Sequence, residues 1–309
     1  MILSVSRRTD IPAFYSEWFA NRIKEGYACV RNPMNFHQVS RINLSPEVVD
    51  CIVFWTKNPS AMMGKLSLLN DYNYYFQFTL NPYGKDIERD VVKKNGIIEV
   101  FKRLSGTIGA KRVVWRYDPI FFTGNIDMDY HLRYFEILAK HLSPYCETCV
   151  ISFLDLYKKT ERNMKNTGAF VPNESEMRLI ASKLAETGGG LGLRIVSCAE
   201  KINLEHEGVS HGHCIDKQLI EHLTGYRLNA KKDPNQRTEC GCIESIDIGE
   251  YNTCMHQCLY CYANYSQTQV LHKHKTHNPN SPLLVGDIGN DDIVKERNVW
   301  SLRDYGLFE

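Results

Sequence analysis

The stretch Cys51-Ile52-Val53-Phe54-Trp55-Thr56-Lys57-Asn58 contains the pattern from which the fold is predicted. Five apolar residues are followed at once by three polar ones. A short continuous apolar run with such a boundary is typical of a strand that is buried on both faces of a parallel sheet. Five other segments, rich in Val, Ile, Phe, Tyr and Trp, have a similar character: residues 2–6, 74–80, 112–117, 149–154 and 191–197.

Segments in which apolar residues recur with a helical period separate these strands. The expected helices are residues 16–25, 60–69, 97–108, 129–142 and 175–186, and glycines or a proline follow where helices commonly stop. Alternation of strands and helices predicts a parallel sheet with right-handed crossovers. Six such units favour an α/β fold of the TIM-like (β/α) barrel or part-barrel type over an open sheet.

The composition is that of an ordinary globular protein. Of 309 residues, 43% are hydrophobic and 24% charged, and the net charge of +1 gives no global attraction to nucleic acid or to an anionic membrane. No apolar run reaches transmembrane length, and the first residues are too polar for a signal peptide. We therefore expect a cytoplasmic protein with reduced cysteines.

A single domain over residues 1–309 is the simplest division of the chain. Successive βα units would occupy residues 1–197, a cysteine-rich, cluster-binding segment residues 198–277, and a surface tail residues 278–309. No sequence repeat or low-complexity linker argues for a second domain.

Polar residues follow the expected strands at their carboxyl ends, where (β/α) barrels place their active sites. The candidates for substrate and catalytic contacts are Arg7, Arg8, Asp10, Lys57, Arg116, Asp118 and Asp155, and those for cofactor contacts include Asn58 and Ser197. The alternative is that these charged side chains form ion pairs that brace the rim of the barrel.

Three of the eleven cysteines stand in the spacing C-x3-C-x2-C, in Cys254-Met255-His256-Gln257-Cys258-Leu259-Tyr260-Cys261. Three thiolates this close can hold three irons of a four-iron, four-sulfur cluster. No fourth cysteine follows at a short interval, so one iron would keep an open position, as catalytic metal sites do. The alternatives are a structural zinc site completed by His256, or a buried group of thiols.

Four further cysteines, Cys198, Cys214, Cys240 and Cys242, are predicted to meet at the same rim. Four thiolates are enough for a fully ligated second iron–sulfur cluster. Zinc, with His211 or His213 as substitute ligands, is one alternative. The other is that Cys198 and Cys214 are small core residues.

The C-x3-C-x2-C spacing resembles the signature of the radical S-adenosylmethionine (SAM) enzymes. The resemblance implies that the open iron chelates SAM, that an electron from the cluster cleaves it to start radical chemistry, and that Tyr260 packs near the adenine. In that family the cluster loop follows the first strand of the core, whereas here it follows an expected strand at residues 243–249 and precedes an expected helix at 262–272. A circularly permuted radical SAM core, with this last strand beside the first one, would reconcile the two orders.

Other motifs carry a second resemblance, which covers nearly the whole chain. Residues 6–12 (SRRTDIP), 53–59 (VFWTKNP), 115–119 (WRYDP) and 240–242 (CGC) are similar to those of the bacterial family called domain of unknown function 1848. That family implies no particular reaction. The Gly-Gly-Glu run with which many radical SAM enzymes hold the SAM amino group is absent after residues 2–6.

The combined prediction is a radical SAM-like iron–sulfur enzyme with one or two four-iron clusters and SAM as cofactors. Its partners would be a small-molecule or macromolecular substrate and an electron donor such as ferredoxin or flavodoxin, with no membrane. One alternative is a non-catalytic iron–sulfur or zinc protein that senses redox state or carries electrons. The other is a nucleic-acid repair or modification protein similar to spore photoproduct lyase, which would bind DNA or RNA in a salt-dependent way.

Overall fold

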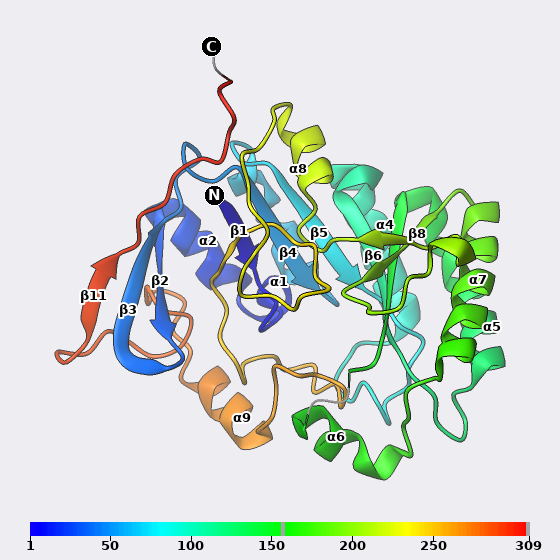
Figure 1. Cartoon of the computed structure of the whole chain (residues 1–309). Helices are drawn as coiled ribbons and strands as arrows, with labels where there is room; N and C mark the ends of the chain where they lie inside the picture. Colours follow the sequence, from blue (N-terminus) through cyan, green and yellow to red (C-terminus); the bar gives the residue numbers. More distant parts are fainter. Residues whose placement is uncertain (156–157, 307–309) are drawn as a thin grey trace.

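The computed structural model describes residues 1–155 and 158–306. Within them, eight strands form one wholly parallel sheet in the order β10-β1-β4-β5-β6-β7-β8-β9 (Figure 1). The strands are β1 (Ile2–Val5), β4 (Cys51–Thr56), β5 (Tyr74–Thr79), β6 (Val113–Ile120), β7 (Thr148–Phe153), β8 (Arg194–Cys198), β9 (Ser210–Gly212) and β10 (Ile246–Asp247). The α/β class with a large parallel sheet is thus confirmed.

The sheet does not close on itself. In the described part of the chain, β9 and β10 stand at its two edges and do not pair with each other, so a closed barrel is not present. The last strand does lie beside the first one, because β10 pairs in parallel with β1 through Leu3 with Ile246 and Ser4 with Asp247. It is only two residues long, shorter than the expected 243–249, since the chain before it is irregular.

Helices connect the strands, and their ends follow local capping signals. The longer ones are α2 (Ser16–Glu25), α4 (Lys94–Ile108), α5 (Met128–Leu142) and α7 (Glu174–Gly190), and the shorter ones are α1 (Ile11–Phe14), α3 (Ser60–Met63), α6 (Lys158–Met164), α8 (Lys217–Thr224) and α9 (Gln267–Lys275). Asn173 and Glu176 form a capping box at the start of α7. None of the helices in the described residues is long and apolar enough to cross a membrane.

Some expected boundaries were wrong. The helix expected at residues 60–69 is divided into α3 and a 3-10 turn at Leu66–Leu69. Helix α7 continues through three glycines to Gly190, so β8 begins at Arg194 rather than at residue 191. Packing against the sheet evidently outweighs the low helix propensity of glycine here.

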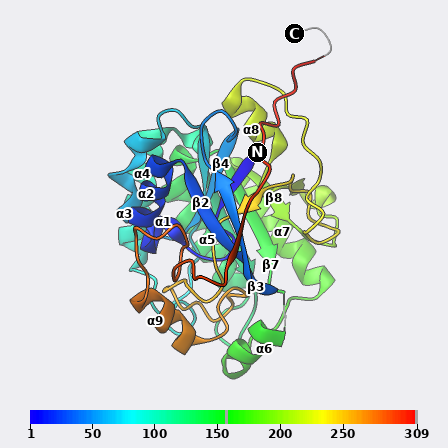
Figure 2. The same cartoon turned by 90° about the vertical axis from the view of Figure 1, so that its left-hand side faces the viewer.

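A second, three-stranded sheet was not predicted. It contains β2 (Tyr27–Asn32), β3 (Asn35–Asn43) and β11 (Ile293–Glu296) in the order β11-β3-β2. The sheet packs beside α2 at one side of the molecule (Figures 1 and 2). The segment expected to be a surface tail therefore contributes a strand, which pairs with β3 and is tied to it by Arg41 and Glu296 at 2.6 Å.

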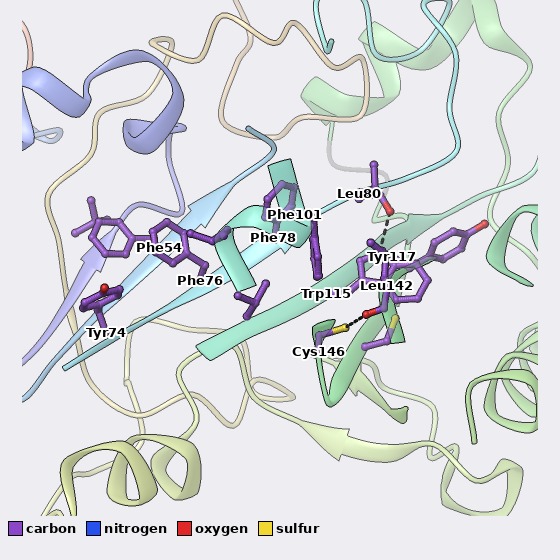
Figure 3. Packing of buried hydrophobic residues seen from close by; sticks show 14 of the residues in the cluster. Phe54, Tyr74, Phe76, Phe78, Leu80, Phe101, Trp115, Tyr117, Leu142 and Cys146 are labelled. Carbon is purple, nitrogen blue, oxygen red and sulfur yellow. Dashed lines mark hydrogen bonds between the residues drawn. The ribbon is translucent and has the colours of Figure 1, made fainter. Parts of the chain in front are cut away.

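Side chains alternate between the two faces of the main sheet. On the face covered by the connecting helices, Phe54 stacks on Phe76 with ring centroids 4.6 Å apart (Figure 3). Trp115 stacks on Phe135 with ring centroids 5.1 Å apart. Burying a side chain of this size contributes about 2–3 kcal/mol. The opposite face carries Val53, Val114, Val150 and Val196, which pack with residues from the chain that follows β8.

Asp247 fastens β10 to β1. Its carboxylate accepts hydrogen bonds from Ser4 Oγ (2.6 Å), Ser6 Oγ (2.7 Å), the Arg7 amide (2.8 Å) and the Gly249 amide (2.9 Å). Each hydrogen bond to a charged group contributes about 1.5–3 kcal/mol, and a partner left buried without one is costly. A two-residue strand is therefore held mainly by one side chain.

We expect D247A to lower the free energy of unfolding by about 3 kcal/mol, because it removes the acceptor of four hydrogen bonds. D247N keeps the shape of the side chain and should lose less. Denaturant unfolding followed by circular dichroism measures both. The exposed Asp71 supplies the control, since D71A should change stability by no more than about 0.5 kcal/mol. Equal stability of D247A and D71A would contradict this role of Asp247.

Candidate functional site

The carboxyl ends of β1, β4, β6, β7 and β8 surround a cavity of about 440 Å³. Eight of the predicted polar and aromatic site residues line it, and so do all seven predicted metal-binding cysteines. The lining residues from the prediction are Arg7, Arg8, Asp10, Lys57, Arg116, Asp118, Asp155, Tyr260, Cys198, Cys214, Cys240, Cys242, Cys254, Cys258 and Cys261. The remaining cysteines, Cys29, Cys51, Cys146 and Cys149, are buried elsewhere.

Two predicted cofactor contacts do not line this cavity. Asn58 Oδ1 accepts hydrogen bonds from Ser60 Oγ at 2.6 Å and from the Ser60 amide at 3.3 Å, so its side chain supports the start of α3. Ser197 is buried in β8 between Val196 and Cys198. Both neighbours pack on the face of the sheet opposite to the connecting helices, which we call the inner face. Since side chains alternate along a strand, Ser197 points to the opposite face.

The cysteine loop that contains Cys254, Cys258 and Cys261 is docked on the segment after β5. The Leu259 amide donates to the Ile87 carbonyl at 3.0 Å, and the Asp90 amide donates to the His256 carbonyl at 3.1 Å. Burial raises the pKa of all three thiols, that of Cys258 to about 12. They are therefore neutral at pH 7, and a bound metal would have to displace their protons.

His256 is held by Asp10 through one of its two ring nitrogens. Its Nε2 lies 2.8 Å from Asp10 Oδ2, and both side chains are nearly fully buried. Asp10 also accepts from the amides of Ala13 and Lys57, at 2.9 and 2.7 Å, so its two oxygens join α1, the end of β4 and the cysteine loop. Asp10, predicted as a catalytic residue, thus has a structural set of partners, whereas His256 Nδ1 is buried with no hydrogen-bond partner in the described residues.

Glu88 is the main residue that the sequence did not single out. Its carboxylate is 1% exposed and binds Lys57 Nζ at 2.7 Å, Lys94 and the Tyr260 hydroxyl. Burial favours the neutral acid, but the charges of Lys57 and Lys94 and their hydrogen bonds outweigh it and lower the pKa of Glu88 to about 2. The one available signal was its place in a loop that follows a strand of the sheet.

The other charged residues at the rim form ion pairs. Arg116 binds Asp118 through both ends of its guanidinium, at 2.5 and 3.2 Å, and Asp155 pairs with Arg237. Arg8 lies 4.0 Å from Asp247. Arg7 lies 3.6 Å from Asp233, and its guanidinium is stacked over Trp55 with 5.4 Å to the ring centroid. These contacts agree with the alternative that the rim charges brace one another.

Thiols of the second set are in direct contact with one another. Cys198 Sγ and Cys214 Sγ lie 2.9 Å apart, and Arg116 Nη1 donates to Cys214 Sγ at 2.9 Å. Cys214 and Cys240 are both hydrogen bonded to Cys242. Hydrogen bonds from the neighbouring thiols, and the charges of Arg116 and Arg7, lower the pKa of Cys214 well below its ordinary value.

A search for three or more His, Cys, Asp or Glu side chains that surround one metal ion found no such group in the described residues. A four-iron cluster makes a different demand, because each thiolate binds a different iron and the ligands need not converge on one point. The finding therefore bears on a single-ion site and leaves the cluster interpretation of the first loop as a prediction.

Comparison with known proteins gives one match. The family described as "Domain of unknown function (DUF1848)" matches residues 2–263, which include the whole sheet and both sets of cysteines. No curated protein and no solved structure matches the chain at a significant level.

We expect E88Q to lower the free energy of unfolding at pH 7 by about 3 kcal/mol, because one pKa unit corresponds to 1.36 kcal/mol. The folded-state pKa of Glu88 lies below its ordinary value of 4.5, so its contribution is full above pH 4.5 and is lost as the pH falls towards 2. Denaturant unfolding at a series of pH values should show the difference between the two proteins narrowing across that window.

The matched control is E99Q, in which an exposed carboxylate loses only its pairing with Lys102. That variant should change stability by less than about 1 kcal/mol. If E88Q has the stability of wild type at pH 7, Glu88 does not hold the cysteine loop in the way described.

Proposed function

The chain belongs to the domain of unknown function 1848 family, and from this premise we propose that it is a radical SAM-type enzyme whose cluster is held by Cys254, Cys258 and Cys261. The observation that carries the proposal is the place of these three thiols. They come from one short loop, face a cavity at the carboxyl ends of a parallel sheet, and are accompanied there by Tyr260. This is the end of such sheets at which α/β enzymes bind their ligands.

The strand order supports a permuted part-barrel core. The cysteine loop follows β10, and β10 lies next to β1 at one end of the row that continues through β4, β5, β6, β7 and β8. In space, the unit of strand and cysteine loop thus precedes the other strands, although it comes last in the sequence. That is the arrangement that a circular permutation of a radical SAM core would produce.

The donor set fits an iron–sulfur cluster better than a single ion. The loop offers three thiols, the nearby carboxylate of Glu88 is neutralised by two lysines, and no three His, Cys, Asp or Glu side chains of the described residues surround a single ion. Thiolates without competing oxygen or nitrogen ligands are the usual set for iron–sulfur clusters. Such a cluster, when bound, supplies an electron that cleaves the sulfonium of SAM.

The residues of the chain hold and enclose this centre. The Tyr260 hydroxyl donates to Glu88 and accepts from Asn81 Nδ2 at 3.3 Å, so the ring has a fixed position at the cavity wall. The Lys57 ammonium lies 5.5 Å from the centroid of that ring and places a positive charge near Cys258. Trp55, Pro119 and Phe153 provide apolar walls that exclude water, which is what the protein must supply when a cofactor carries out the chemistry.

The decisive experiment is anaerobic reconstitution with iron and sulfide, followed by an assay for 5′-deoxyadenosine with SAM and dithionite. Wild type should form this product, whereas C258A should lose it and about four irons, because one ligand of the cluster is removed. The control is C29A, which replaces a buried cysteine that packs with Val39 and Leu283, outside the cavity. C29A should keep both product and iron.

Product formation by C258A at the wild-type rate would refute the assignment of this loop. A wild-type protein that binds iron and sulfide but forms no 5′-deoxyadenosine would instead be a non-catalytic iron–sulfur protein. Circular dichroism of C258A should match that of wild type, because the sheet does not depend on this side chain.

A further inference from the structure

A second group of cysteines, distinct from the loop of the proposed cluster, meets on the inner face of the sheet. Cys198 ends β8, Cys214 follows β9 by two residues, and Cys240 and Cys242 come from the irregular chain that leads to β10. The four side chains are 8%, 8%, 7% and 1% exposed, and none is in a disulfide. Three segments that are separate in the sequence thus bring four sulfur donors together, and His213, next to Cys214, has a buried Nδ1 with no hydrogen-bond partner in the described residues.

The contacts among the four thiols form one continuous chain. Cys198 lies 2.9 Å from Cys214, Cys214 is hydrogen bonded to Cys242, and Cys242 to Cys240. The Ile215 amide also donates to Cys242 Sγ at 3.3 Å. Four buried thiols that touch one another have no apolar packing advantage over alanine or valine that explains why all four are cysteine.

Two glycines let these segments come close together. A Cβ on Gly212 would lie 2.5 Å from Val196 Cγ2, and a Cβ on Gly241 would lie 2.1 Å from the ring of His213. Gly241 stands between Cys240 and Cys242, so its missing side chain allows His213 to pack on the backbone there. In Cys240-Gly241-Cys242, the residue between the two cysteines must therefore be a glycine for His213 to pack there.

Two guanidinium groups lie beside the thiols, and each is also paired with a carboxylate, Arg116 with Asp118 and Arg7 with Asp233. Arg116 Nη1 donates to Cys214 Sγ at 2.9 Å, and Arg7 Nη2 is buried with no hydrogen-bond partner in the described residues. Four thiolates around zinc(II), or around an oxidised four-iron cluster, carry a net charge of about −2. Guanidinium groups beside them stabilise such a charge more than they would stabilise neutral thiols.

The chain around the group has little regular structure of its own. Apart from α8, it contains β9 with three residues, β10 with two, and isolated bridges such as Lys232 with Ile243. This chain separates the cavity described above from a second one of about 400 Å³, lined by Gly212, His213 and Gly241. A metal bound by all four cysteines would cross-link the segments of this chain and hold the chain in place between the two cavities. Structural metal sites stabilise other domains with small cores in the same way.

From this geometry we infer that Cys198, Cys214, Cys240 and Cys242 form a four-thiolate metal centre, separate from the loop of Cys254, Cys258 and Cys261. The ligand chemistry is four sulfur donors, which suits a closed, fully ligated site. Zinc and an iron–sulfur cluster share this chemistry, and the experiment distinguishes them. In the described residues the thiols do not surround a single ion, so either occupant would draw the sulfurs apart from their present contacts. The inference does not depend on SAM chemistry at the first loop.

The test counts metal and sulfide in protein purified without oxygen and reconstituted with iron and sulfide, or with zinc. The triple variant C254A/C258A/C261A should keep either about four irons with equal sulfide or one zinc per chain, since only the second group remains. Adding C240A and C242A to it should remove this metal. C29A, which changes a cysteine outside both groups, should bind as much metal as wild type.

The outcomes separate this inference from the proposed function. A triple variant with no metal, next to a C29A protein that keeps it, overturns the second centre. A triple variant that keeps all the metal of wild type overturns the cluster of the first loop and leaves the second centre intact.

If a variant does not fold, alkylation of the wild-type protein still tests the second metal centre. Cys198, Cys214, Cys240 and Cys242 should be alkylated at least tenfold faster after treatment with a chelator, as mapped by mass spectrometry. Alkylation at one rate with and without chelator, or a disulfide between Cys198 and Cys214, would overturn the inference.

Discussion

The parallel pairing of β10 with β1 is the contact on which the rest of the site depends. It joins residues more than 240 positions apart in the sequence, and the Asp247 carboxylate holds it by accepting four hydrogen bonds, from Ser4 in β1, from Ser6 and Arg7 just after β1, and from Gly249 after β10. Because the cysteine loop begins a few residues after Asp247, this pairing delivers it to the carboxyl ends of the strands. Closing so long a loop costs conformational entropy, and the contact needs the edge of β1 that the rest of the sheet holds in place.

The ion pairs around the cavity are a consequence of the burial of its charged side chains. Charges withdrawn from water must be paired, and Arg116 with Asp118 and Glu88 with Lys57 and Lys94 meet that requirement. Such pairs fix the shape of the cavity, but they leave few charged groups at the rim without a partner. What remains chemically distinctive is sulfur, since seven cysteines face one cavity.

The two groups of cysteines differ in how the surrounding chain holds them. The first comes from one loop and is supported by neighbouring side chains such as Glu88 and Asn81. The second comes from the end of β8 and from two segments of the chain after it, where β9 and β10 are only three and two residues long. A metal centre at the first group would provide chemical reactivity. A metal centre at the second group would stabilise the fold, because the free energy of metal binding to thiolates adds directly to the stability of the folded state.

The sequence by itself determined seven of the eight strands of the central sheet, the longer helices and the set of cysteines, because apolar periodicity, helix stops and short ligand spacings are local properties. It did not predict β9, which has only three residues and no apolar run. Tertiary structure decided which polar side chains reach the cavity. Ser197 and Cys198 are neighbours in β8, yet only Cys198 points inward, since the direction depends on the register of the sheet. Glu88 meets Lys57 and Tyr260, and β11 finds β3, only because distant segments fold against one another, and no local pattern encodes such contacts.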